Sequence, residues 1–312
     1  MPSPLILSFG SVNIDVTARG KRLPTPGETI HAESYAIGLG GKGANQAAAA
    51  ARLGAGRGMR SALVGRIGAD TFGKQAREAL QTFGVDLTGL REDAESATGL
   101  ALIGIDAAAE NCITVVGGAN LSVDESDVSH AESLFAEASV LLLQLEVPVA
   151  AVLAAARRGR AAGAKVILDP APAPSSPLPD ELWPLVDVVT PNETETAALC
   201  GVLPMTQEDA ARAASLLMVR GVTAAVVKMG ARGVWWQSAE GSGFVPPFPV
   251  QAIDTVAAGD CFNAGLAVAL AGGASLGDAV RAAAATGALA VTKRGAADAA
   301  PEWSEVQALL QG

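Results

Sequence analysis

Cysteine, histidine and aromatic residues are scarce in this sequence. Its 312 residues include three cysteines, two histidines and one tyrosine, and aromatic residues make up only 4%. Cys112, Cys200 and Cys261 are far apart and lack the spacing of metal ligands, which argues against a disulfide framework or a zinc site and favours a reducing compartment. So few aromatic rings leave little to stack against nucleic-acid bases.

Positive charge and long apolar runs are also lacking. The chain has 22 Lys and Arg against 32 Asp and Glu, and the net charge of −10 repels phosphate backbones. No uncharged segment reaches the ~20 apolar residues of a membrane span, and the first apolar run, LILSF at Leu5–Phe9, has no basic lead before it. We therefore expect a soluble cytoplasmic protein with neither a nucleic-acid nor a membrane partner.

Small apolar residues in a regular rhythm are what the sequence does contain. Half of the residues are apolar, enough for one large core. After Ala138, short apolar runs that suit buried strands alternate with helical stretches, which is typical of parallel βαβ units. We predict a single α/β domain over residues 1–312, with a central, mostly parallel sheet flanked by helices. The strands are expected at 139–147, 165–170, 186–192, 224–230 and 233–238, and the helices at 149–163, 193–201, 208–220, from about 260 and at 275–292.

Four extended segments nearer the N-terminus predict a second, smaller sheet. Val12–Ile37 contains two of them, separated by the turn residues PTPG. Thr98–Gly118 is predicted to form a hairpin that turns at Ala107–Glu110. We expect these segments, at about 12–37 and 98–116, to lie outside the main body.

The stretch GLGGKGANQAAAAARLG, from Gly38 to Gly54, has the spacing G-x-G-x-x-G before a predicted helix. A Rossmann dinucleotide site needs an acidic residue about 20 positions later, and none occurs between Ala44 and Ala69. A Walker phosphate loop is excluded as well, because its first glycine position is occupied by Ala36. These observations oppose an NAD(P) oxidoreductase.

Two interpretations of the glycines stay open on the residues alone. Dense glycine lets the backbone pass close to a ligand, and Lys42 and Asn45 at the helix start would suit a polyhydroxylated one. The alternative is a glycine turn that only packs against the sheet.

The stretch DTVAAGDCFNAG, from Asp254 to Gly265, is more specific. Small residues, Ala258 and Gly259 among them, precede Asp260 and an apolar helix, so free backbone N–H groups are expected beside one carboxylate. Such amides would stabilise a transferring phosphoryl group while Asp260 accepts the proton of the attacking hydroxyl. An ordinary helix cap by Asp260 is the alternative.

Seven motifs in a fixed order resemble the ribokinase family of sugar kinases, of the phosphofructokinase-B type. They are GSVNID, PTPGET, GGKGANQA, QLEVP, TPNETE, MGARGVW and DTVAAGDCFNAG, and the resemblance runs from end to end. It implies a ribokinase-like fold whose small sheet is a lid over the site and a homodimer formed through that lid. It further implies transfer of the ATP γ-phosphoryl group to the 5-hydroxyl of D-ribose, with Asp260 as base and the amides of Ala258, Gly259 and Asp260 as the anion hole.

The resemblance also implies ligand-binding residues. Asn192 and Glu195 match a motif that organises Mg²⁺ and its waters around ATP, and Lys228 stands where the family often has Thr. A monovalent cation, K⁺, is implied beside the anion hole, although Ala299 replaces an expected Ser. The implied sugar-binding residues are Asn13, Asp15, Gly41, Lys42, Asn45, Glu146 and Asp260, those for ATP are Asn192, Glu195, Lys228 and Gly230, and those for K⁺ are Asp254, Val256, Ala290, Lys293 and Gly295.

Two rival functions remain. One is a kinase of the same fold with another acceptor, such as deoxyribose, a ketohexose derivative, a keto-deoxy sugar acid or a nucleoside. The other is a non-catalytic sugar sensor, which the intact Asp260 argues against.

Overall fold

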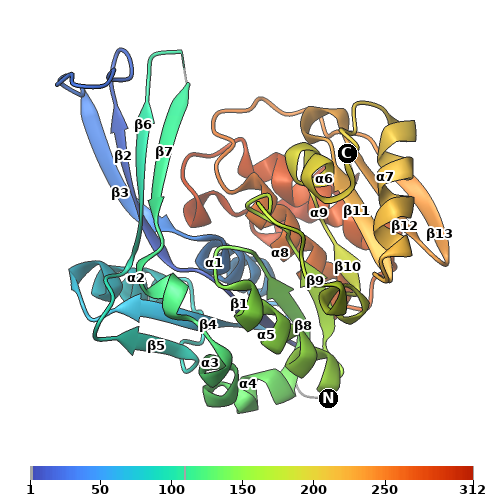
Figure 1. Ribbon diagram of the computed structural model, residues 1–312. Helices are drawn as coiled ribbons and strands as arrows, with labels where there is room; N and C mark the ends of the chain where they lie inside the picture. The colour runs from blue at the N-terminus through green and yellow to red at the C-terminus, as the bar shows by residue number, and fades with distance from the viewer. Residues whose placement is uncertain (1–2, 109, 312) are drawn as a thin grey trace.

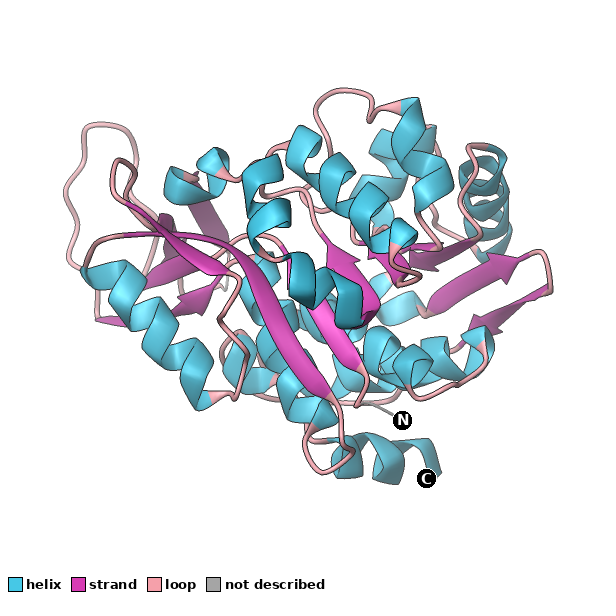
Figure 2. Cartoon of the chain, turned by 90° about the horizontal axis from the view of Figure 1, so that it is seen from below, coloured by secondary structure: helices cyan, strands magenta, loops and turns pink. Residues whose placement is uncertain are grey.

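The computed structural model describes residues 3–108 and 110–311, and helices lie on both faces of its larger sheet (Figures 1 and 2). That sheet has nine strands in the order β13-β12-β11-β10-β9-β8-β1-β4-β5. Neighbours from β11 to β5 are parallel, and β12 and β13 add an antiparallel end. The strands are β1 (Leu5–Phe9), β4 (Arg60–Gly68), β5 (Leu90–Asp93), β8 (Ala138–Leu143), β9 (Lys165–Leu168), β10 (Val188–Val189), β11 (Ala224–Lys228), β12 (Val234–Ser238) and β13 (Gly241–Val245).

The helices flank this sheet. The α-helices are α1 (Lys42–Gly54), α2 (Thr71–Thr82), α3 (Glu125–His130), α4 (Glu132–Glu137), α5 (Val149–Ala161), α6 (Glu193–Cys200), α7 (Gln207–Val219), α8 (Ala258–Ala271), α9 (Leu276–Ala290) and α10 (Trp303–Gln311). Short 3₁₀ turns are η1 (Gly118–Ser122), η2 (Asp180–Leu185), η3 (Gly230–Arg232) and η4 (Ala297–Ala299). No described helix is both long and apolar enough to cross a membrane.

Burial of β1 on both faces explains its uninterrupted apolar sequence. Leu5, Leu7 and Phe9 pack into the core cluster that contains residues of α4, α5 and α7, whereas Ile6 packs into the cluster formed with α1, α8 and α9. Small residues bring the helices of the second layer close together. A Cβ atom on Gly265 of α8 would lie 2.5 Å from Oγ1 of Thr286 on α9.

A four-stranded sheet stands apart from this body, and we call it the lid sheet (Figure 1). Its order is β3-β2-β6-β7: two antiparallel hairpins joined by the parallel pair β2 and β6. Both predicted segments therefore contribute to one sheet, although Ala109, at the predicted second turn, lies outside the described residues. The strands are β2 (Asn13–Arg19), β3 (Ser34–Gly40), β6 (Gly99–Ile105) and β7 (Asn111–Val116).

Candidate active site

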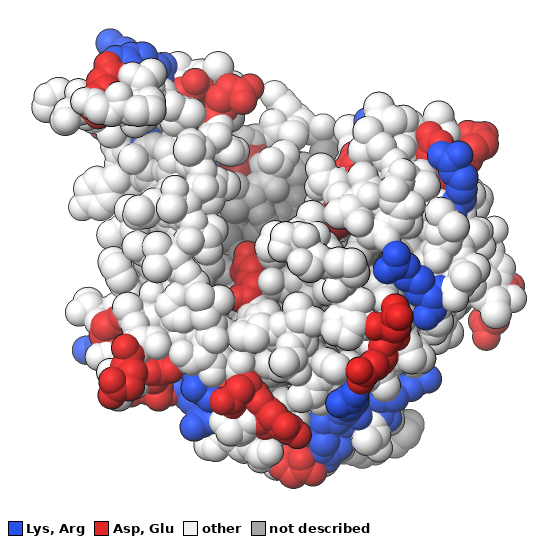
Figure 3. All heavy atoms as spheres, viewed as in Figure 1, with Lys and Arg blue, Asp and Glu red and all other residues white. Residues whose placement is uncertain are grey.

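The lid sheet and the body enclose a hollow on the face shown in Figure 3, and acidic side chains are visible within it. The carboxyl ends of β1, β8, β9 and β11 lie at one edge of the larger sheet, the edge at which parallel α/β sheets bind ligands. At this edge the chain leaves the strands and continues into β2, α1 and the loops that follow the strands. This topology brings together polar residues that are far apart in the sequence.

Asp260 lies in the first turn of α8 with 4% of its surface exposed. Its Oδ2 accepts a hydrogen bond from Asn45 Nδ2 at 3.1 Å, and its Oδ1 accepts one from Gln46 Nε2 at 3.0 Å. Burial raises the pKa of Asp260 to about 6, with a further increase from Asp169, while the charge of Lys42 opposes the rise. A carboxylate with this pKa can take a proton at neutral pH.

The start of α8 leaves backbone amides free beside that carboxylate. Ala257 is the helix N-cap in a left-handed conformation, φ 55°, so the alternative in which Asp260 caps the helix is wrong. Among the described residues, the amides of Gly259 and Asp260 have no acceptor. The amide of Ala258, by contrast, donates to the carbonyl of Thr255 at 3.3 Å. Of the three amides predicted to bind an anion, those of Gly259 and Asp260 are therefore free to do so.

A second group of charges lies on the lid side of Asp260. Glu146 Oε2 accepts hydrogen bonds from the Lys42 amide at 3.0 Å and from Ser11 Oγ at 2.5 Å. Burial, reinforced by Glu146 and Asp260, raises the pKa of Asp15 to about 6. Burial would lower the pKa of Lys42, but the surrounding carboxylates outweigh it and raise that pKa instead. Lys42 thus stays charged as the counter-ion of the carboxylates around it. We call Asp15 and Glu146 the acidic cluster.

Three glycines around the start of α1, Gly40, Gly41 and Gly43, allow close backbone packing. Gly41 is the N-cap of α1 with φ 86°, a value that an L side chain rarely adopts. A Cβ on Gly43 would lie 2.5 Å from the carbonyl carbon of Gly10, and one on Gly40 would lie 2.0 Å from Asp15 Oδ1. Gly38 has open space around it. The turn therefore packs against the segment that carries Asp15, as the packing interpretation predicts, and the ligand-binding interpretation stays a prediction.

The other predicted sugar residues flank the same point. Asn45 donates to Asp260, and its Oδ1 is buried without a partner among the described residues, so it can accept a ligand hydroxyl. The side-chain Oδ1 of Asn13 instead accepts a bond from Asn120 Nδ2 at 2.7 Å. Asn13 therefore has a structural use that the sequence analysis did not anticipate.

A cavity of about 760 Å³ opens from Lys42 and Asp260 toward the end of β11. This volume suits a small organic ligand. Its lining includes the charged residues Asp169, Glu195 and Lys228 together with a largely apolar part. The four residues predicted to bind ATP, Asn192, Glu195, Lys228 and Gly230, all line it, and the apolar part of the lining includes Pro246, Pro247, Phe248, Pro249, Val250, Ala284, Gly287, Ala288 and Val291.

Asn192 and Glu195 form a capping box at the start of α6. Asn192 Oδ1 accepts the Glu195 amide at 2.9 Å, and Glu195 Oε2 accepts the Asn192 amide at 2.8 Å. Burial raises the pKa of Glu195. No group of three His, Cys, Asp or Glu side chains suited to a metal occurs among the described residues. The pair can therefore hold Mg²⁺ through waters, as its oxygen donors permit, but not as a dedicated cage.

The residues predicted to hold K⁺ come from the loop before α8, from α9 and from the loop after it. Asp254 accepts the amide of Val256 at 3.1 Å and the amide of Gly295 at 3.3 Å. The carbonyl of Ala290 accepts the amide of Lys293 at 3.0 Å, and Lys293 Nζ pairs with Glu305 at 2.9 Å. The loops are thus tied together beside the start of α8.

Sequence reasoning missed two residues of the site, Gln46 and Asp169. Gln46 Nε2 donates to Asp169 Oδ2 at 3.1 Å as well as to Asp260, and Asp169 Oδ1 pairs with Lys228 Nζ at 3.1 Å. The signal for Asp169 was its place directly after the apolar strand VIL, at the ligand-binding edge of the sheet. Gln46 carried a weaker signal: it is the polar residue one helical turn after Lys42 in an alanine-rich helix.

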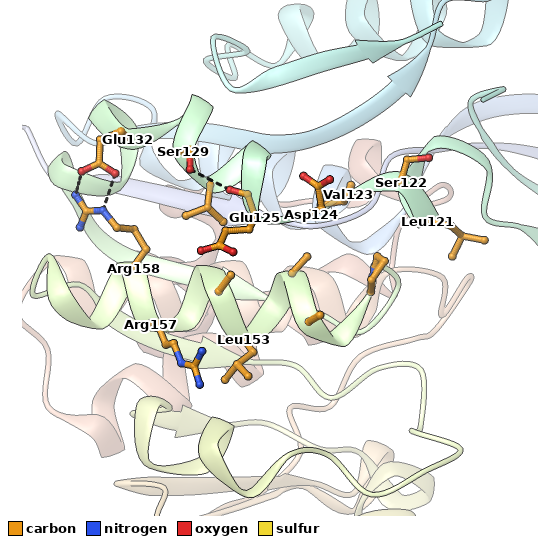
Figure 4. Close-up of a pocket in the computed structure, with 15 residues that line it drawn as sticks. Leu121, Ser122, Val123, Asp124, Glu125, Ser129, Glu132, Leu153, Arg157 and Arg158 are labelled. Atoms are coloured by element: carbon orange, nitrogen blue, oxygen red, sulfur yellow. Dashed lines mark hydrogen bonds and ion pairs between the residues drawn. The ribbon is translucent and has the colours of Figure 1, made fainter. Parts of the chain in front are cut away.

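A larger hollow of about 930 Å³ lies elsewhere, between α3, α4 and α5 (Figure 4). Its Arg158 is paired with Glu132, and its Arg157 pairs with Glu181, so both of its cations already have partners. It brings together no acid, base and free amides of the kind found at Asp260. We therefore assign the chemistry to the cavity beside α8.

Comparisons with known proteins identify the family of this chain. The family model for pfkB family carbohydrate kinases matches residues 3–303. The chain is 40% identical over 303 residues to a ribokinase of Haemophilus influenzae, covering 97% of each, and 36% identical over 307 residues to a ribokinase of Schizosaccharomyces pombe, covering 96% of each. Its fold matches a structure of Arabidopsis thaliana ribokinase complexed with ribose and ATP, with a TM-score of 0.92, 35% identity and full coverage of both chains. The chain belongs to the pfkB family of carbohydrate kinases.

Proposed function

We propose that this chain transfers the γ-phosphoryl group of ATP to the 5-hydroxyl of D-ribose, giving ribose 5-phosphate. The observation that carries this proposal is the position of Asp260, which lines the cavity and also bonds to Asn45 beside the acidic cluster. One carboxylate therefore faces both a place for a nucleotide and a place for a polyhydroxylated acceptor. The ribokinases to which the chain is similar supply the choice of substrate.

The sugar is held by complementary donors and acceptors. Asp15 and Glu146 accept from its hydroxyls, Lys42 and the backbone around Gly41 donate, and the free Oδ1 of Asn45 takes another hydroxyl. Each hydroxyl left unpaired would cost about 1 to 3 kcal/mol. Asn13 donates through its side-chain Nδ2, because only its Oδ1 is engaged by Asn120.

Asp260 removes the proton from the attacking hydroxyl as the oxygen approaches the γ-phosphorus in line. The free amides of Gly259 and Asp260 then stabilise charge on the transferring group, with Ala258 at the same helix start. Lys228 and Gly230 line the cavity where the phosphates of ATP would extend. The apolar part of the lining receives the adenine ring of ATP.

We also propose positions for two metal ions, Mg²⁺ and K⁺. Mg²⁺ would be organised through waters by Asn192 and Glu195, and when bound it would neutralise charge on the phosphates. K⁺ would be held by carbonyls of the tied loops at Asp254, Val256, Ala290, Lys293 and Gly295, where it would steady the amides of α8. Ala299 supplies no hydroxyl to that site.

We further propose that the body and the lid sheet act as one kinase domain in the cytoplasm, where the three free cysteines stay reduced. The lid sheet covers the sugar and keeps water away from the phosphoryl group. It also pairs with the lid sheet of a second copy, because its apolar side chains are exposed on all but one of the lid strands.

A coupled assay of ADP release over a panel of acceptors tests the substrate. We expect D-ribose to give the highest kcat/KM, above deoxyribose, ketohexoses, keto-deoxy acids and nucleosides. Asp260→Asn should lose on the order of 10³-fold or more in kcat while it still binds ribose by calorimetry, because only proton removal is lost. Turnover with ribose no faster than with buffer would disprove the substrate, and an active Asp260→Asn would disprove the base.

A further inference from the structure

A buried pair of carboxylates shares a single amide at the base of the site. Gln46 Nε2 donates one hydrogen bond to Asp260 at 3.0 Å and another to Asp169 at 3.1 Å. All three side chains are nearly inaccessible: Gln46 is 0% exposed, Asp169 2% and Asp260 4%. The two N–H groups of one amide thus bridge two carboxylates in a dry environment, where unpaired charge is costly.

A hydrogen bond to the side-chain oxygen of Gln46 fixes the orientation of this bridging amide. Gln46 Oε1 accepts a bond from Gln144 Nε2 at 2.7 Å, so only its NH₂ group can face the carboxylates. Gln46 also lies one turn after Lys42 on α1, so the same helix face presents a cation and a bridging donor to Asp260.

The far carboxylate is held by a cation at the nucleotide cavity. Asp169 Oδ1 pairs with Lys228 Nζ at 3.1 Å, and both residues line the cavity. A Cβ on Gly259 would lie 3.7 Å from Lys228 Nζ, which places this cation next to the free amides of α8. A continuous polar chain therefore runs from Lys228 through Asp169 and Gln46 to Asp260.

We propose that Gln46 and Asp169 are positioning residues that orient the carboxylate of Asp260 and set its charge environment, with Lys228 as the balancing cation. Gln46 occupies Oδ1 of Asp260 and Asn45 binds Oδ2, so the rotation of the carboxylate is fixed before the hydroxyl arrives. The charge of Asp169 makes Asp260 a stronger base, and that of Lys228 weakens the effect. This inference rests on the proposed role of Asp260 as base.

Other charges that face Asp260 are Lys42 of α1, the counter-ion of the acidic cluster, and Asp15 of β2, a member of that cluster. Since burial and neighbouring charge give Asp260 a pKa of about 6, activity should fall as the pH drops through that value, because the base becomes protonated. Asp15 has a raised pKa as well, so profiles of kcat are recorded at saturating sugar and compared with those of Asp15→Asn.

The test uses two substitutions with opposite expected effects. Asp169→Asn keeps the shape and removes a negative charge, so the midpoint of the acidic limb of kcat should move down by about one pH unit. Lys228→Met, measured at saturating ATP, should move the midpoint up, because Asp169 is no longer balanced. The double variant should return close to the wild-type midpoint. Glu132→Gln, which removes the acid of the ion pair with Arg158 in the other hollow, should leave the midpoint unchanged.

Gln46→Leu should lower kcat on the order of 10- to 100-fold with little change in ribose KM. Unmoved midpoints in both single variants would overturn the proposal, as would a loss of activity explained by a lowered melting temperature alone. If no acceptor is phosphorylated, the proposed function fails, but ¹³C NMR titration of the Asp260 carboxyl in wild type and Asp169→Asn still decides this inference.

Discussion

At Gly43 a single methyl group decides whether α1 can begin beside the segment that carries Asp15. A Cβ there would lie 2.5 Å from the carbonyl carbon of Gly10 and 2.6 Å from the Ser11 nitrogen, and both are backbone atoms that cannot rotate away. We expect Gly43→Ala to destabilise the fold by about 1 to 3 kcal/mol, as overpacking does. Gly38→Ala is the matched control, because nothing lies within 4 Å of its Cβ. Denaturant unfolding of both variants measures the difference, and equal stabilities would contradict the packing role.

The residue scale also separates what the sequence could predict from what it could not. Asp260 and its helix start were predictable, since small residues before an acid have a local physical meaning. The bridge from Gln46 to Asp169 was not, because it joins residues 123 positions apart and depends on how the fold places α1 relative to the loop after β9. The amide of Ala258 also turned to Thr255, a detail of local geometry that residue types do not reveal.

At the scale of elements, the start of α2 ties the body to the lid sheet. Asp70 caps α2 through the Gly73 amide at 2.7 Å, and it also accepts bonds from the amide and the hydroxyl of Thr98 at 2.8 and 2.7 Å. Thr98 directly precedes β6, so one carboxylate holds a helix and the root of a lid strand.

We expect Asp70→Ala to raise the KM for ribose several-fold and to cost about 1 to 2 kcal/mol of stability from the lost cap. The reason is that β6 would no longer be fixed over the sugar. Thr206→Ala is the control, because it removes the cap of α7 without touching the lid sheet. Steady-state kinetics and thermal unfolding distinguish the two effects. A KM that changes equally in both variants would show that Asp70 acts only as a cap.

The strand and helix alternation after Ala138 was predictable because each buried parallel strand is a short apolar run. The elements between α1 and the second lid hairpin, β4, α2 and β5, were not assigned from sequence, since arginine and glycine interrupt the apolar run of β4 and charged residues are mixed into α2 and β5. β13 was missed for a different reason: the run GSGFV has two glycines and pairs only at the sheet end. It forms a strand because it pairs with its neighbour, β12.

At the scale of the whole molecule, the lid sheet has an exposed apolar face that the chain itself does not cover. By its strand register, the face opposite Asp15 carries Tyr35, Ile37, Leu102 and Val116, which are 76%, 43%, 46% and 49% exposed. Such a surface across a sheet favours pairing with a second copy.

We expect the protein to be a dimer in solution and Leu102→Lys to shift it toward the monomer, because a buried unpaired ammonium at the interface is costly. Val115→Lys, on the face that looks toward Asp15, is the matched control and should leave the dimer intact. Light scattering coupled to gel filtration measures the mass of both variants over a range of concentrations. A monomeric wild type would disprove the pairing, and a dimer lost only in Val115→Lys would assign it to the opposite face. In the proposed function the lid sheet covers the sugar, so the monomeric variant should also have a raised KM for ribose with little change in the KM for ATP.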